Sequence, residues 1–441
     1  MPTRNDTILS LLREAASHVV PCPDGDPSTS GWMNAENRRT PLASILTNSG
    51  PMTIASPGLE AYERAVTLLA KEPAIRNAWD LNELWSVVAS LVISSSGKTD
   101  LELRIVNWLE HVRKASGGIV AFVVGNVEWA GERFEFADGL IGLLDKDFQA
   151  ELSVNAAKQH LAPIAENWCS EVRQRYEGLL PTVAFATSTK EKGSRSIGSA
   201  FGKFRILIDL TLLFMQGTLH ELCRQCARVN RPGVRGLALD RRSVELKLGG
   251  KTSGELDADI VYLSSPRFGR ETHWHNAEPF PLAEILRAPG VGALVAAYLV
   301  KEGPVADRVR IAARWYSESH WAEELQDSAL ALGIALDALV GSPSGLPLRA
   351  LSERFALLEE LPRQRTLKAR RFRELYGIRS AVAHGARSTS LNSATLTGMA
   401  DEVFWAAGRL DELDRRFTPK TERQLEEVFE GLRWGTHGWS D

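Results

Sequence analysis

The pattern of apolar and polar positions changes several times along the chain. Residues 1–20 and 59–116 carry apolar side chains at helical spacing. Residues 21–58, between them, are rich in Pro, Gly, Ser and Asn and show little periodicity. We therefore expect a short amphipathic helix, an irregular arm and then a group of helices.

The middle of the chain mixes strand and helix patterns. Residues 119–136 contain a β-branched run, a turn and an alternating segment, which together predict a β-hairpin. Further strands are expected at 182–187 and within 234–264. A Gly/Ser/Lys loop at 190–199 is expected to precede a long apolar helix at 201–228.

From residue 281 onward helical periodicity dominates. Residues 305–340 predict one helix or two abutting ones, and the breaker-rich segment after residue 340 ends them. Further helices are expected at 348–361, 366–382 and 396–417, with short connections that favour an antiparallel bundle. The fold class is therefore an α+β region up to about residue 300, followed by an all-α part.

Bulk composition narrows the function classes. The 441 residues carry a net charge of −3, so any contact with nucleic acid must come from a local patch. No secretory signal and no membrane-spanning apolar run is evident, and four cysteines do not make a disulfide framework. The cytoplasm of a bacterium is the default location.

One charged residue falls on the apolar face of the helix expected at 366–382. Arg379 shares a stripe with Phe372, Leu375 and other apolar side chains, among them Leu367, Tyr376 and Val382. Burying a charge there is costly unless it has a partner. His384 follows five residues later, about 140° around the helix. One helix would not aim both side chains at one atom, but two copies related by a two-fold axis could.

These residues resemble the Arg-x4-His motif of HEPN domains, in particular the ApeA-like group. The matching residues are Tyr376, Arg379, Ser380, His384 and Gly385, preceded by Ala313-Arg-Trp-Tyr316 and by residues 331–341. The resemblance covers about residues 305–415. It implies a bundle of four or five helices that dimerises, often as a metal-independent endoribonuclease acting as a toxin or antiphage effector, with no cofactor. Asp337 stands where Glu is more usual.

The residue types suit RNA cleavage by the RNA's own 2′-hydroxyl, which leaves a 2′,3′-cyclic phosphate. Histidine titrates near neutral pH, so His384 is suited to move a proton. Arg379 can hold two phosphate oxygens as negative charge builds. Ser380 is a candidate for binding the phosphate or fixing the imidazole, and Asp337 for orienting His384 or pairing with Arg379.

A basic run precedes the motif. Between residues 363 and 379, seven positive side chains face one negative side chain. With Tyr376, six of them are candidate RNA-binding residues: Arg363, Arg365, Lys368, Arg370, Arg371 and Arg373. A solvated helix face is the alternative for the run, and a place in the core is the alternative for Tyr376.

Two further clusters have the spacing of metal ligands. His220 with Cys223 and Cys226, and His273 with His275, each lack a complete ligand set. A zinc or other metal site is therefore not expected at either one.

The two regions of the chain are expected to have different roles. We expect residues 1–300 to form a region that senses a phage-derived or nucleic-acid trigger or restrains the nuclease, and 301–441 to form the HEPN-type bundle. The expected partners are RNA and a second copy of the chain, and no membrane. Two alternatives remain open: a bundle that binds RNA, nucleotide or protein without chemistry, and a structural Arg379–His384 pair in a dimerisation platform.

Overall fold

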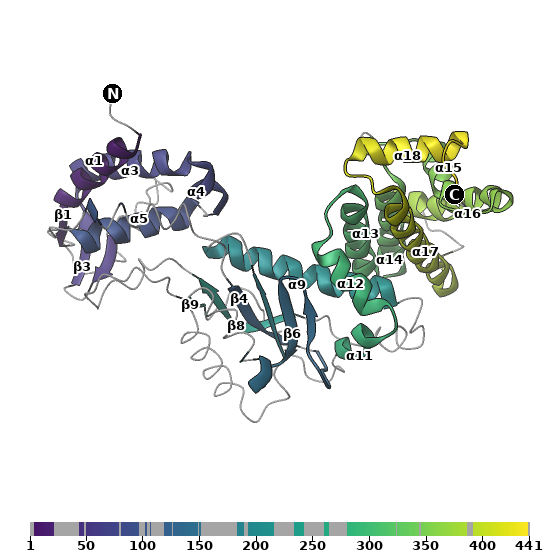
Figure 1. Cartoon of the computed structure of the whole chain (residues 1–441), viewed down its shortest axis with the longest axis horizontal. Coiled ribbons are helices and arrows are strands. Elements are labelled where there is room, and N and C mark those ends of the chain that lie inside the picture. The colour runs from purple at the N-terminus through teal and green to yellow at the C-terminus, as the bar shows by residue number, and fades with distance from the viewer. Residues whose placement is uncertain are drawn as a thin grey trace. The chain divides into compact units, whose positions relative to one another are not determined.

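The structure is a computed structural model of the whole chain (Figure 1). It describes residues 4–21, 44–47, 50–78, 81–96, 102–103, 106, 119–125, 127–148, 150, 183–188, 193–215, 233–241, 260–263, 280–322, 324–343, 345–385 and 391–439. The chain divides into two compact units. The first comprises 1–123, 143–201 and 234–270, and the second comprises 124–142, 202–233 and 271–441.

The beginning of the first unit is a helical layer with a small sheet. Its elements are α1 (Arg4–Ser17), β1 (Val19–Pro21), β2 (Ser44–Thr47), β3 (Gly50–Ile54), α3 (Ser56–Ala70), α4 (Pro73–Ala78) and α5 (Leu81–Ser95). Figure 1 shows α1, α3 and α5 side by side, and their apolar faces share one core. The helices expected at 1–20 and over 59–95 are confirmed, while most of 97–116 lies outside the described residues. The expected irregular arm differs, because β2 and β3 within it pair in antiparallel register.

A six-stranded sheet follows, in the order β5-β6-β7-β4-β8-β9. Its strands are β4 (Ile119–Gly125), β5 (Phe134–Phe136), β6 (Gly139–Leu143), β7 (Val183–Ser188), β8 (Gly233–Arg241) and β9 (Ile260–Leu263). The hairpin expected at 119–136 is wrong, because β5 pairs with β6 and two strands separate it from β4. The sequence pattern identified the strands, but pairing depends on contacts that no local pattern records.

A long helix, α9 (Gly193–Met215), begins where a loop was expected. Its Phe201 packs edge-on against Phe122 of β4, with ring centroids 4.8 Å apart. Small and polar residues at 193–199 concealed the first two turns of this helix. The segment expected to continue it, 216–228, lies outside the described residues.

The last part of the second unit is all-α from Leu282 onward within the described residues. Its helices are α11 (Leu282–Arg287), α12 (Val291–Val300), α13 (Pro304–Trp321), α14 (Leu325–Val340), α15 (Leu348–Leu357), α16 (Pro362–Ala383), α17 (Ser393–Phe417) and α18 (Glu422–Trp434). Figure 1 shows α13, α14 and α17 side by side. The expected α+β region followed by an all-α part is the architecture observed. No helix in the described part of the chain is long and apolar enough to cross a membrane.

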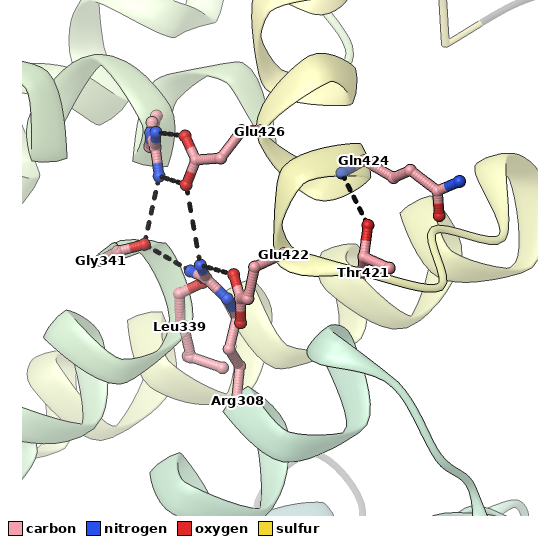
Figure 2. A network of polar contacts seen from close by, with 8 residues as sticks. Arg308, Leu339, Gly341, Thr421, Glu422, Gln424 and Glu426 are labelled. Atoms are coloured by element: carbon pink, nitrogen blue, oxygen red, sulfur yellow. Dashed lines mark hydrogen bonds and ion pairs between the residues drawn. The ribbon is translucent and has the colours of Figure 1, made fainter. Parts of the chain in front are cut away.

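The sequence pattern had not indicated α18, although a local signal existed. The hydroxyl oxygen of Thr421 accepts a hydrogen bond from the N–H of Gln424 at 3.3 Å, as at a capped helix start (Figure 2). Threonine followed three residues later by glutamine is a capping pattern that marks this helix start in the sequence.

Two arginines of the bundle form ion pairs with glutamates of α18, in the polar network drawn in Figure 2. The buried Arg308 of α13 donates to the carbonyl of Gly341 at 2.5 Å and pairs with Glu422 at 2.7 Å. Arg354 of α15 pairs with Glu426 and donates to the same carbonyl at 3.1 Å. Burial, followed by the charge of Arg308, lowers the pKa of Arg354 to about 10. The two glutamates of α18 thus compensate two desolvated cations.

Candidate functional site

The helix α16 carries the Arg-x4-His motif at its end: the helix ends at Ala383, and His384 is its C-cap. Proline at the first position needs no backbone donor, so Pro362 is a favourable start. At the other end the N–H of His384 donates to the carbonyl of Ser380 at 3.1 Å. Gly385 adopts a left-handed conformation, with φ of +73°, which terminates the helix. The motif therefore spans the last turn of α16 and its cap.

Arg379 lies between α16 and α14. Its guanidinium group is 3.5 Å from the carboxylate of Asp337, and the two side chains are 27% and 26% exposed. The stem of Arg379 lies against Gly333, one turn before Asp337 on α14. The structure therefore brings together Arg379 and Asp337. The importance of Gly333 was not foreseen from the sequence, where a helical glycine has no distinguishing signal.

The Arg379–Asp337 pair is incompletely satisfied. Among the described residues, neither Oδ1 of Asp337 nor Nε of Arg379 has a hydrogen-bond partner, although both atoms are buried. Burial raises the pKa of Asp337, and the charge of Arg379 opposes that rise. The buried Nε is closed to solvent, but the Arg379 side chain is 27% exposed, so its terminal nitrogens beside one carboxylate retain capacity for another anion.

Tyr376 lies next to the pair. Its ring stacks on Phe372 with centroids 5.8 Å apart, and the guanidinium carbon of Arg379 lies 5.3 Å from its centroid. Tyr376 is half-buried, so it connects the apolar face of α16 to the arginine.

His384 lies away from this cluster. It is exposed, whereas Arg379 contacts α14, and helical geometry separates their directions by about 140°. The half-buried Ser380, one turn before His384, lies nearer to the histidine's side of the helix than to Asp337. One chain therefore does not join the arginine and the histidine in one site.

The basic run divides into packed and exposed members. Lys368 pairs with Glu402 at 2.7 Å and lies 3.6 Å from the ring centroid of Trp405. Arg365 donates to the carbonyl of Glu359 at 2.9 Å, and burial lowers its pKa. These contacts give Lys368 and Arg365 structural partners that spacing along the sequence did not reveal.

The other cations of the run are more accessible. Arg363, Arg370 and Arg373 are exposed, and Arg371 is half-buried, 3.9 Å from Glu374. Leu367 is 67% exposed, so the expectation that it lies on the apolar stripe is wrong. At 100° per residue, Arg370, Arg373 and His384 face the same side of α16. A basic and histidine-bearing face is thus opposite the one that holds Arg379.

The described residues contain no group of three or more His, Cys, Asp or Glu side chains that could hold a metal ion. The candidates His220, Cys223, Cys226, His273 and His275 lie outside the residues that the structure describes.

Comparisons with known proteins found no relative. No protein-family model matches the chain, and no match was found among curated proteins or solved structures. The HEPN resemblance therefore stays a prediction that rests on the motif and on the helical setting of its residues.

Proposed function

We propose that this protein is a HEPN-type endoribonuclease whose active site uses Arg379 and His384. The observation that carries the proposal is the placement of Arg379, whose side chain is 27% exposed and whose guanidinium lies 3.5 Å from the carboxylate of Asp337. The structural Arg308 also has a buried Nε without a partner in the described part of the chain, but its terminal nitrogens donate to two carbonyls and to Glu422.

The chemistry follows from the groups present. The 2′-oxygen of a ribose attacks the adjacent phosphorus, the bond to the 5′-oxygen breaks, and a 2′,3′-cyclic phosphate and a 5′-hydroxyl result. His384 takes the proton of the 2′-hydroxyl as the new bond forms and gives a proton to the leaving 5′-oxygen, and the guanidinium of Arg379 stabilises the negative phosphorane oxygens. Exposed Arg363, Arg370 and Arg373 supply phosphate contacts along the RNA. No step in this scheme requires a metal ion.

The site is proposed to form between two copies of the chain. Arg379 and His384 face different sides of α16, so a second copy would bring a histidine toward the arginine. Gly377 is exposed and lies about 20° around the helix from His384, and a Cβ added there would meet nothing within 4 Å. Close approach of another helix is sterically allowed at that point.

RNA cleavage by the full-length chain tests the chemistry. His384→Ala is expected to lower the rate about 10²–10⁴-fold, the usual contribution of a general acid or base, and Arg379→Ala to a comparable degree. Arg423→Ala, which removes an exposed arginine with an 88% accessible side chain, is the control and should cleave normally. Products should carry a 2′,3′-cyclic phosphate. Cleavage that is unchanged in both variants would overturn the proposal.

Mixing the two inactive variants tests the shared site. In a dimer of Arg379→Ala with His384→Ala, one of the two intersubunit sites keeps both residues, so activity should return. If both residues acted within one chain, the mixture would stay inactive. RNA that is bound by the wild type and by His384→Ala, but never cut, would instead favour a binding module without chemistry.

A further inference from the structure

The contact between α14 and α16 depends on one residue that has no side chain. A Cβ built on Gly333 would lie 2.6 Å from the Cβ of Arg379, and it would be closer still to the Cγ. Real Cβ atoms essentially never have neighbours under 3.0 Å. Since the Cβ of Arg379 is fixed by its backbone, a change of rotamer alone would not relieve the overlap.

Gly408 and Gly398, two other helical glycines of this unit, differ from Gly333, whereas a Cβ at Gly292 or Gly431 would also lie under 3.0 Å from a neighbouring atom. A Cβ at Gly408 on α17 would meet nothing within 4 Å, and one at Gly398 would approach only the guanidinium tip of Arg371. Glycine inside a helix is less favourable than alanine, so its presence at 333 calls for a packing reason. The overlap with the Arg379 stem provides that reason.

We propose that Gly333 is a positioning residue of the RNA-cleavage site: the missing side chain lets the Arg379 stem pass against α14, which places the guanidinium beside Asp337. Gly333 lies one turn before Asp337 on the same helix face. The space at Gly333 therefore receives the aliphatic stem of Arg379, and the carboxylate of Asp337 receives its guanidinium. The catalytic part of this inference rests on the proposed ribonuclease function.

Gly333→Ala is the direct test, with Gly408→Ala as the matched control. In RNA cleavage by the full-length chain, Gly333→Ala is expected to lower kcat about 100-fold, the effect of a displacement of roughly 1 Å at a reacting group. KM should stay near the wild-type value, because Arg363, Arg370 and Arg373 are not disturbed. A folded Gly333→Ala with normal kcat, or an equal loss in Gly408→Ala, would overturn the inference.

A second measurement does not depend on cleavage. Burial raises the pKa of Asp337, and the charge of Arg379 opposes that rise. If Gly333→Ala displaces the guanidinium, the carboxyl resonance of Asp337 should titrate at higher pH than in the wild type, as it should in Arg379→Met. Gly408→Ala should leave that titration unchanged. A wild type that cuts no RNA would overturn the ribonuclease proposal, while this titration would still decide the role of Gly333.

A third comparison separates a general loss of stability in Gly333→Ala from an effect that depends on Arg379. Arg379→Ala removes the Cγ and Cδ atoms that the new methyl group would meet. The drop in the urea midpoint caused by Gly333→Ala should therefore be smaller in an Arg379→Ala background than in the wild type. Because Arg379→Ala keeps the Cβ atom, part of the drop should remain; an equal drop in both backgrounds would show that Gly333 does not accommodate the Arg379 stem beyond Cβ, and the inference would fail.

Discussion

Two groups of arginines in the same helical bundle are held in different ways. Arg308 and Arg354 contact the carbonyl of Gly341 and the glutamates of α18, and their side chains are 6% and 13% exposed. Arg379 has one carboxylate at 3.5 Å and 27% exposure, although it shares with Arg308 a buried Nε that has no partner among the described residues. The first arrangement compensates charge to hold helices together, and the second leaves donors available beside solvent.

The same contrast divides the basic run on α16. Lys368 is enclosed by Glu402 and Trp405, whereas Arg370 and Arg373 extend from the exposed face. A cation with a carboxylate and an aromatic ring around it would lose both on binding a phosphate. The comparison therefore assigns Lys368 to stability, and assigns the exposed arginines to the proposed RNA contact.

The largest expected effect on stability is at Arg308. Arg308→Ala removes hydrogen bonds to two carbonyls and leaves Glu422 unpaired. We expect a loss of about 3 kcal/mol in the free energy of unfolding, measured by urea denaturation. The control Arg423→Ala breaks only an exposed pair with Glu427 and should cost less than about 0.5 kcal/mol. A loss at Arg308 as small as the control's would contradict its structural role.

A smaller loss is expected for Lys368. Lys368→Ala removes an ion pair with Glu402 and a cation–π contact with Trp405, which together contribute about 1–2 kcal/mol. RNA affinity, measured by filter binding or anisotropy, should not change. Weaker RNA binding with unchanged stability would place Lys368 among the RNA contacts and would break the comparison.

The exposed arginines should behave in the opposite way. Arg370→Ala combined with Arg373→Ala should change the unfolding free energy by less than about 0.5 kcal/mol. The slope of log affinity against log salt should fall by about 1.4, the contribution of two phosphate contacts on single-stranded RNA. An unchanged slope would mean that Arg370 and Arg373 do not contact RNA phosphates and belong to an ordinary solvated helix face.

The smallest effect concerns Asp337 and pH. Because burial raises its pKa, the folded state binds this proton more tightly than the unfolded chain does. The stabilisation is present at low pH and is lost as the pH rises from the unfolded value through the raised one. Urea unfolding from pH 3.5 to 7 should therefore show the wild type losing stability relative to Asp337→Asn. A trend in the opposite direction would mean that the ion pair with Arg379 outweighs desolvation.

Part of the fold was open to sequence reasoning. Helix and strand periodicity identified α1, α3, β4, β7 and the helices from α13 to α17, because each element buries one face with its own repeat. The pairing of the strands could not be predicted from the sequence, since the local pattern is equally compatible with a β4–β5 pair, which the sheet does not contain. The α18 helix was missed for a different reason. Its capping pattern is present in the sequence, but the pairing of Glu422 with the buried Arg308, which holds the helix in the bundle, is visible only in the tertiary structure.

The candidate site divides in the same way. The sequence by itself determined that Arg379 lies on the apolar face of its helix and that His384 points elsewhere, since both statements need only the 3.6-residue repeat. The tertiary structure decided which group meets Arg379, which cations of the basic run are enclosed, and why position 333 has no side chain. Those facts depend on distances between α14, α16 and α17, which are set by packing between residues far apart in the chain.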